Sequence, residues 1–439
     1  MEQKDLVNAK HPDYDVLYNK RKIYKDVFAG TLRLRKAEQT YLRKFPAELP
    51  ASYADRLNSS TLFNMTEKTA NIMTGLVFQN EIELQPDVPG VIKALTENID
   101  NQGNHLNVFA RECFLRSFEG LSLILVDAPD SANIESLEDE RRLELRPYWI
   151  RYDADDIINW KTRVNPISKS TEISLIVLRE TKQEKNGMFL TKDVTRYRVL
   201  YLDDNNDVAW QVWREDKANI NSKEVTLTKE SFGIIEKVSR IPIAVIYGQK
   251  TGILKGDPPL LDLAMTNLRH YNKQSNYDNL LSLACIPVLY AKGMEAKKDN
   301  VIAFGSDILV HLSADGELGW ALVDGGAFAS LQTDLKDIEN QMALLGLSLL
   351  ADKTTGVDLT ATEALLNSIA ETAELRVMAS SLSDALETCL DYTAEYLGLG
   401  RANGGGIKLG TAWSKIEMEV DTGDNILPQN PPTPQELTN

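Results

Sequence analysis

The sequence has few of the features that mark secreted, membrane-spanning or zinc-binding proteins. It contains three cysteines, Cys113, Cys285 and Cys389, and none is spaced for a disulfide framework or a CxxC zinc site. All three lie in apolar surroundings, so we expect buried structural thiols. The first residues lack the apolar core of a signal peptide, and no run of about 18 apolar residues occurs anywhere. We therefore expect a protein of a reducing cytoplasm with no membrane span.

Recognisable catalytic motifs are also missing. The sequence has no GxxxxGK[ST] phosphate loop, no HExxH, no GxSxG and no deaminase-type zinc motif. The acidic run at residues 153–156 lies between strand-like segments, which favours a turn over a cation site. The histidines are scattered without metal-ligand spacing: His11, His105, His270 and His311. This pattern predicts a structural or binding protein without metal or cofactor, although a site can also assemble from distant residues.

The charge balance is strongly acidic, with a net charge of −16. Charged residues make up 26% and hydrophobic residues 43%, which is enough for a sizeable core and unlike a disordered chain. The length predicts roughly two to three domains. A protein that grips nucleic acid usually presents a basic face. This chain either avoids DNA or meets it along a surface that does not hold it.

The first half of the chain mixes helical and strand-like patterns. Apolar spacings of three and four residues predict helices over 14–29, about 52–74 and 106–118. Residues 121–247 hold short alternating runs separated by Asp, Asn and Gly, which predict strands. The DDNND at 203–207 lies between two such runs and predicts a hairpin loop. We expect an α+β fold.

The second half has a distinctive order of elements. A long helix is predicted over 257–284 and is followed by a small extended module over 285–325. A second long helix over 326–350 comes next, then a polar break at 351–359. The longest helix is predicted over 360–397. Two long helices that flank a small module make a stalk with a tip.

Local signals set the ends of these helices. Pro258 and Pro259 are placed at the first turn of their helix, where proline is tolerated. Thr360 and Glu363 form a capping-box pattern, and Gly398 ends the longest helix. The glycine-rich NGGGIKLG stretch favours a turn over a phosphate site, and the proline-rich residues 425–439 predict an extended or disordered tail.

This order of elements resembles phage portal proteins. In that family two stem helices flank a clip domain, a tunnel loop follows, and a long spine helix crosses the wing. Short stretches also resemble portal-like sequences common in prophages: HPDYDVLYNKRKIYKDVFAG, TYLRKFP, TLFNMTEKTANIMTGLVF, RPYWIRYDADDIINW, GDPPLLDLAMTNLRHY and TATEALLNS. Each stretch is weakly specific, and the joint occurrence in this order carries the resemblance.

The resemblance implies a portal-like α+β architecture. It consists of an α/β wing, a two-helix stem, a small β-containing clip and a long spine helix. Many portals also carry a helical crown, which is minimal or absent here because little chain follows the spine. The implied boundaries are wing 1–256, stem helices 257–284 and 326–350, clip 285–325, tunnel loop 351–359, spine and C-terminal wing 360–424, and tail 425–439.

The resemblance also implies a function and partners. The chain would form a homo-dodecameric ring at one vertex of the capsid in the virion, assembled in the host bacterial cytoplasm. Double-stranded DNA would pass through its channel during packaging and ejection. The major capsid protein, the terminase large subunit and a head–tail adaptor would be its partners, with no enzymatic activity, no cofactor and no membrane.

Three groups of residues are candidates for these roles. The tunnel loop holds Asp352, Lys353, Thr354 and Thr355, of which Lys353 is the candidate for a transient phosphate contact. Acids of the second stem helix, Asp334, Asp337 and Glu339, either line the channel, face solvent or pair with a neighbour. Contacts of the clip with terminase or adaptor are assigned to Lys292, Lys297, Lys298 and Trp320, although Trp320 can instead belong to the clip core.

Two other classes of function stay open at this point. One is a different structural subunit, such as another head–tail connector or adaptor protein. The other is a phage nuclease or capsid-maturation protease with a non-standard site. An enzyme of that kind should show a cluster of acids or a nucleophile with its base, and the sequence shows neither.

Overall fold

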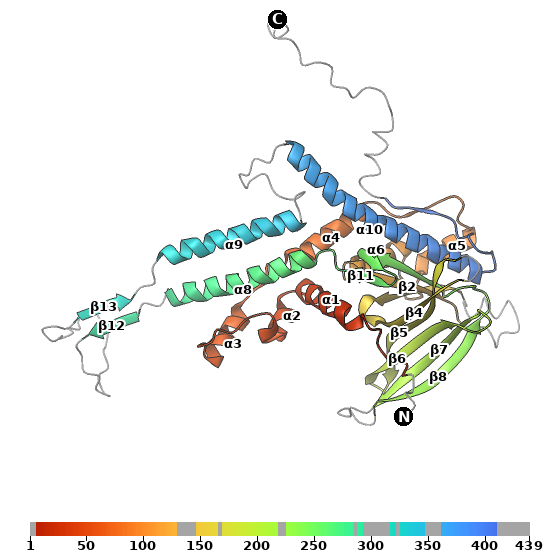
Figure 1. The fold of residues 1–439 in the computed structure, drawn as a ribbon, viewed down its shortest axis with the longest axis horizontal. Helices are drawn as coiled ribbons and strands as arrows, with labels where there is room; N and C mark the ends of the chain where they lie inside the picture. The colour runs from red at the N-terminus through yellow and green to blue at the C-terminus, as the bar shows by residue number, and fades with distance from the viewer. Residues whose placement is uncertain are drawn as a thin grey trace, which may run out of the picture. The chain divides into compact units, whose positions relative to one another are not determined.

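The computed structural model describes residues 6–129, 146–165, 169–217, 225–284, 288–292, 317–321, 325–346 and 361–410. The fold mixes helices and sheets, as an α+β class requires (Figure 1). The chain divides into two compact units, each built from separate stretches of sequence. The sheet unit comprises Met1–Tyr18, Ala70–Pro259 and Ala370–Asn439, and the helix unit comprises Asn19–Thr69 and Leu260–Ile369.

The sheet unit contains a five-stranded antiparallel sheet in which neighbours in sequence are neighbours in space. The turn predicted at 203–207 is confirmed, because the Asp203 amide donates to the Asp207 carbonyl at 3.0 Å between two strands of this sheet. The alternating runs of the sequence therefore form one meander. Its strands are β4 (Ile157–Val164), β5 (Thr171–Lys185), β6 (Thr191–Leu202), β7 (Val208–Lys217) and β8 (Val225–Ile235).

A smaller, three-stranded sheet has β2 at its centre, between β3 and β9. Strand β2 reads as a continuous apolar run because both its faces are buried. The helix predicted over 106–118 is confirmed as α6 and packs against β2. The remaining short elements of this unit are β1 (Glu83–Leu84), α5 (Gly90–Leu95), α6 (Leu106–Ser117), β2 (Leu121–Asp127), β3 (Tyr148–Asp153), β9 (Ile243–Tyr247), β10 (Gln249–Gly252), β11 (Lys255–Asp257) and β14 (Ile407–Lys408).

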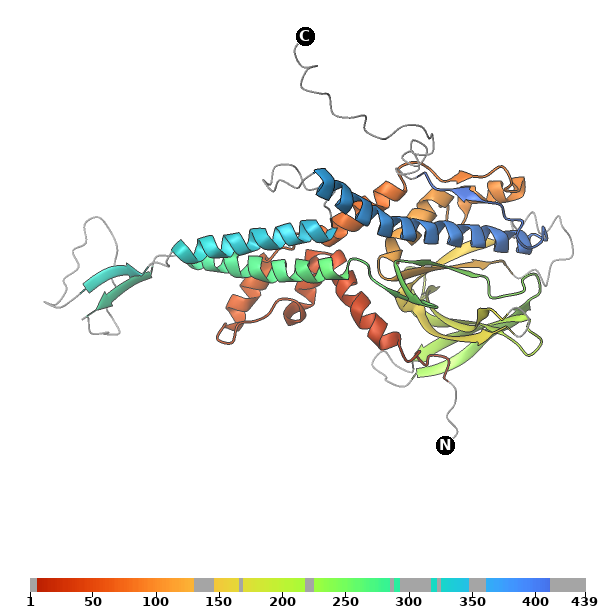
Figure 2. The same ribbon diagram turned by 45° about the horizontal axis from the view of Figure 1, so that its top comes forward.

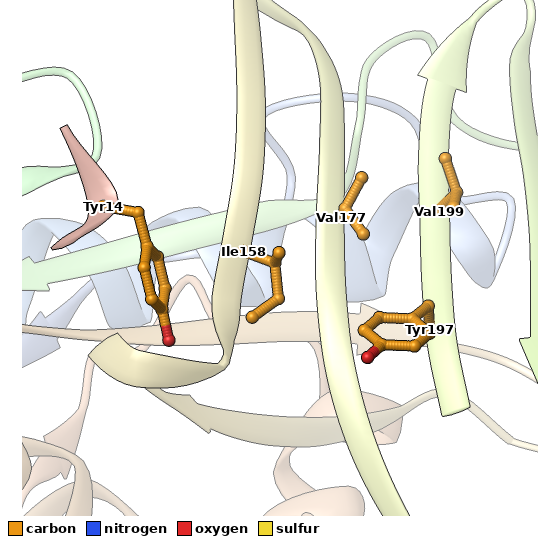
Figure 3. Packing of buried hydrophobic residues seen from close by; sticks show 5 residues of the cluster. All are labelled: Tyr14, Ile158, Val177, Tyr197 and Val199. Atoms are coloured by element: carbon orange, nitrogen blue, oxygen red, sulfur yellow. The ribbon is translucent and has the colours of Figure 1, made fainter. Parts of the chain in front are cut away.

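One face of the five-stranded sheet packs against the N-terminal segment (Figure 3). Figure 3 shows Tyr14 beside Ile158, with Val177, Tyr197 and Val199 on the next two strands. The Tyr14 hydroxyl donates to the Asp155 carbonyl at 2.9 Å. Every second residue of β5 and β6 thus faces this cluster, which is what the alternating pattern predicted.

The acidic run at 153–156 forms a turn, as predicted. Residues Ala154–Asp156 form one 3-10 turn between β3 and β4. The Asp156 carboxylate accepts a hydrogen bond from the Arg179 guanidinium at 3.2 Å. This hydrogen bond attaches the turn to Arg179 of β5.

The opposite face of the five-stranded sheet carries a partly buried charge network centred on Arg198. Its guanidinium donates to Asp127 of β2 and to Glu180 of β5, both at 2.6 Å. The Tyr152 hydroxyl also donates to Glu180, and Tyr148 donates to Asp127 at 3.3 Å. Burial, and then the Asp127 carboxylate, raise the pKa of Tyr148 to about 12, so this hydroxyl keeps its proton. The network ties the two sheets of this unit together.

The helix unit begins with short helices rather than the single helix predicted over about 52–74. The prediction is wrong because the chain is extended at Ser60 and Asn64 starts a new helix, its side chain accepting from the Glu67 amide at 3.2 Å. The Leu62 amide donates to the Thr31 hydroxyl at 3.0 Å, and this hydrogen bond keeps the chain extended between the two helices. The helices are α1 (Tyr14–Phe28), α2 (Thr31–Lys36), α3 (Pro50–Ser59) and α4 (Met65–Val77).

The long helices of the second half form at the expected places with shifted ends. They are α8 (Leu261–Ala284), α9 (Gly325–Gly346) and α10 (Ala361–Tyr396). Pro258 and Pro259 precede α8 instead of opening it, because Lys255–Asp257 pairs as strand β11. Gly398 ends α10 with φ at 72°, as predicted. Thr360, the tunnel loop at 351–359 and the tail at 425–439 lie outside the described residues.

We predict that Arg198→Met destabilises the protein by about 1–3 kcal/mol, because two partly buried carboxylates lose the cation that they share. Chemical denaturation followed by circular dichroism measures this loss. Arg214→Met is the matched control, since Arg214 lies on the same sheet face and is more exposed. Equal destabilisation by both variants would contradict the role given to Arg198.

Candidate functional site

The helix unit contains two long helices that run side by side, α8 and α9 (Figures 1 and 2). The antiparallel strands β12 (Val288–Lys292) and β13 (Glu317–Ala321) lie between them in sequence, and Figure 1 shows this hairpin at one end of the pair. We call α8, α9 and the hairpin the stalk. Its order of elements matches the predicted helix, extended module and helix.

An apolar seam joins the two helices of the stalk. On α9 the buried residues are Leu335, Ile338 and Met342, which recur every three or four positions and form one stripe. On α8 the buried Leu263 lies beside Gly346 at the end of this stripe. Because α8 covers this stripe, the face of α9 that remains exposed is the opposite one.

Gly346 sets how closely the end of α9 approaches its neighbours. A Cβ atom built there would lie 2.8 Å from the Thr69 hydroxyl and 2.9 Å from a methyl carbon of Leu263. Such a contact is too short for a methyl group, so glycine permits the close packing of α9 on α4 and α8.

Two of the three predicted channel acids form contacts across the stalk. Asp334 accepts a hydrogen bond from Lys273 and forms an ion pair with Arg269 at 3.7 Å. Glu339 lies 3.3 Å from Nε2 of the buried His270. Both acids of α9 thus contact α8 of the same chain. Of the alternatives given for these acids, pairing with a neighbouring residue describes them.

Asp337 is the predicted acid that points away from the seam. It is exposed and makes no hydrogen bond or ion pair to any other residue that the structure describes. Thr333, Asn340 and Leu344 share its face of α9 by helical spacing, and all are exposed. This exposed face of α9, defined by these residues, is the surface of the stalk that remains available to a ligand or a neighbour.

A buried asparagine, which sequence reasoning missed, holds α8 against the start of α4. The Asn267 carboxamide donates to the Phe63 carbonyl at 2.7 Å. Its oxygen accepts from the Met65 amide at 3.0 Å and from the Thr66 amide and hydroxyl at 3.3 and 3.2 Å. The Asn267 side chain thus supplies the acceptor at the N-terminal end of α4, where the first amides of a helix lack partners within the helix. A polar residue among apolar positions of α8 was the available signal.

A buried ion pair supports α3 in the same unit. The Arg56 guanidinium donates to Glu48 at 2.7 and 2.8 Å and to the Arg43 carbonyl at 2.8 Å. The hydrogen bond from Arg56 lowers the pKa of Glu48, so the carboxylate stays charged. Arg56 is also 3.3 Å from the Ser275 hydroxyl, which joins α3 to α8.

Most of the other predicted site residues lie outside the described part of the chain. This applies to Asp352, Lys353, Thr354 and Thr355 of the tunnel loop and to Lys297 and Lys298 of the clip. Lys292 is exposed at the end of β12, where it pairs in register with Glu317. The backbone of Trp320 lies in β13 opposite Leu289, and its side chain is not described.

The described cysteines have the buried, inert environment that the sequence predicted. Cys113 and Cys389 are fully buried, and burial raises the pKa of both thiols well above the usual value. Cys285 lies outside the described residues. Among those residues, no group of three His, Cys, Asp or Glu side chains is arranged to hold a metal ion. No described helix is long and apolar enough to cross a membrane.

Residues 259–397 match the family model described as a domain of unknown function, DUF4055. The match spans α8, the hairpin, α9 and α10, so the family model covers the stalk and the longest helix. No curated protein matches the chain.

Two solved structures show a distant likeness to the chain. One is a chain from the neck of an empty gene transfer agent (GTA) particle computed with C6 symmetry, with 11% identity, a TM-score of 0.42 and coverage of 81% of this chain and 84% of that chain. The other comes from the virion of a native GTA particle, with 12% identity, a TM-score of 0.40 and coverage of 88% and 92%. These scores are too low to establish a common fold.

We predict that Asn267→Leu destabilises the protein by about 1–3 kcal/mol, because buried amides at the start of α4 lose their acceptor. Asn340→Leu, at an exposed position of α9, is the control and should change stability little. Thermal denaturation of both variants tests this difference. A loss no larger than that of the control would show that water replaces Asn267 without cost.

Proposed function

We propose that this chain is a structural portal subunit of a phage capsid and not an enzyme. Twelve copies would form a ring at one vertex, through which double-stranded DNA enters and leaves the capsid. The observation that carries the proposal is the order of elements in the stalk, followed by the long helix α10. In the portal-like assignment, α8 and α9 are the stem, the hairpin is the clip and α10 is the spine.

The exposed face of α9 supplies the surface for a channel wall. The seam with α8 fixes which side of α9 is covered, so the Asp337 side remains open. Ring symmetry would repeat Asp337 around the passage. DNA carries one charge per ~1.7 Å of helix axis, so acids in the wall would repel it and let it slide.

The remaining portal roles follow from the same assignment. The clip, with Lys292, Lys297, Lys298 and Trp320, would dock the terminase during packaging and the head–tail adaptor afterwards. The five-stranded and three-stranded sheets would belong to the wing, which faces the major capsid protein. The tunnel loop, with Lys353, would touch the phosphates of passing DNA.

Electron microscopy of the purified protein in negative stain tests the ring directly. We expect rings with a central channel, mostly of twelve subunits. Compact monomers at micromolar concentration, with no rings even after concentration, would contradict the proposal. Assays for nuclease and protease activity would then be the next measurement.

Reversal of the charge at Asp337 tests the wall of the channel. Asp337→Lys rings should bind duplex DNA about tenfold more tightly than wild-type rings at low salt, because added cations release counterions from DNA. Asp384→Lys makes the same charge change at an exposed position of α10 and should have little effect. Fluorescence anisotropy with labelled duplex DNA at several salt concentrations measures both.

Identical DNA affinity of the Asp337→Lys and wild-type rings would place the exposed face of α9 away from the DNA. A rise of equal size in Asp384→Lys would mean that net charge alone, rather than a position in the channel, decides the affinity.

A further inference from the structure

The β5–β6 hairpin of the sheet unit ends in three large apolar side chains that face solvent. Met188 and Phe189 are each 88% exposed, and Leu190 is 67% exposed. The turn itself is closed by the Asn186 amide, which donates to the Leu190 carbonyl at 2.8 Å, with Gly187 at φ 91°. Since turns favour polar residues and glycine, the turn does not need these apolar side chains. We call residues 186–190 the hairpin tip.

Lysines surround the hairpin tip. Lys182, Lys185 and Lys192 are exposed on the two strands that lead to it. Glu184 lies among them, but Arg196 at 2.9 Å and Arg214 at 3.1 Å already neutralise its carboxylate. Asp193 is an exposed acid on these strands, so three lysines against one exposed acid leave the edge of the tip cationic, in a chain whose net charge is −16.

The same unit carries a second apolar surface on the open part of its five-stranded sheet. Strand register places Val177, Val199, Gln211 and Phe232 on one face. The N-terminal segment covers the β5 and β6 side of that face, but on β8 Phe232 is 72% and Ile234 is 54% exposed.

This second surface carries a cation beside Phe232 and acids beyond Ile234. The Lys229 ammonium lies 5.2 Å from the rings of both Trp213 and Phe232 and covers part of the apolar area. Beyond Ile234, the β6–β7 turn presents exposed Asp204 and Asp207. We call Trp213, Phe232 and Ile234 the open sheet face.

A single copy cannot bring its own hairpin tip onto its own open sheet face. Phe232 aligns across the sheet with Val177, and the tip begins at Asn186, nine positions along the chain from Val177. At about 3.3 Å per residue, that separation is roughly 30 Å along a continuous sheet. The hairpin tip can therefore reach an open sheet face only on another copy.

We propose that the hairpin tip of one copy packs on the open sheet face of the next copy. The two surfaces are both apolar at the centre, and the lysines beside the hairpin tip match the aspartates beyond Ile234 at one end of the open sheet face. A closed ring needs two different, complementary surfaces on each subunit, and these two surfaces meet that requirement. The inference rests on the proposed ring: a reciprocal two-fold dimer would close after two copies, whereas head-to-tail contacts continue from copy to copy around a ring.

An engineered disulfide tests the contact in the full chain. The double variant Phe189→Cys with Ile234→Cys should give a ladder of covalent oligomers on a non-reducing gel after mild oxidation. Each single variant alone should give no ladder, and a mixture of the two single variants should give dimers at most. These controls separate the engineered contact from reactions of the native cysteines.

A charge in the hairpin tip tests the contact without new cysteines. Phe189→Asp should weaken association of the copies at least about tenfold, because one large apolar contact is lost. Val164→Asp changes a similarly exposed apolar residue, 61% exposed at the end of β4, and should assemble as wild type. Mass photometry over a range of concentrations measures both, and circular dichroism verifies that each variant folds.

The outcomes separate this inference from the portal proposal. Rings that form without covalent oligomers, and that Phe189→Asp leaves intact, overturn this contact and leave the portal proposal standing. Covalent oligomers in a protein that never forms rings support the contact and overturn the portal proposal. Absence of both overturns both.

Discussion

The packing of α9 on α8 is the contact on which the stalk depends. Leu335, Ile338 and Met342 fix one side of α9 against α8, and Gly346 lets its end approach α4 closely. Because this side is fixed, the opposite side is the surface that can face a passage. The same packing also neutralises one acid of α9, since the Asp334 carboxylate pairs with Lys273 and Arg269 of α8. The exposed face of α9 is thus less acidic than the composition of the helix suggests. In the proposed ring, the repulsion of DNA would come from Asp337 repeated in every subunit.

In the sheet unit, both faces of the five-stranded sheet need to be covered. One face is closed by the second sheet and by the Arg198 network, whose paired charges are stable only while they stay together. The N-terminal segment, with Tyr14, covers part of the other face. The part near Phe232 stays open, and the hairpin tip adds another exposed apolar group. The proposed ring would cover both of these exposed apolar surfaces.

Much of the architecture could be predicted from the sequence because its signals are local. The helix at 106–118, the turn at 203–207 and the end of α10 at Gly398 each follow from spacing or from one conformationally special residue. Features set by distant contacts could not be predicted. The break before α4 depends on Thr31, and the start of α8 depends on the pairing of Lys255–Asp257 with β10. The partners of Asp334 and Asn267 could not be read from spacing either, because they depend on which helices become neighbours.

The most direct test of the portal proposal is a cryo-electron microscopy map of the assembled protein that resolves the wall of its channel. The proposal predicts that α9 lines the narrow part of the channel and that Asp337 faces the lumen in every subunit. A ring whose lumen is lined by the sheet unit, with the stalk on the outside, would contradict it.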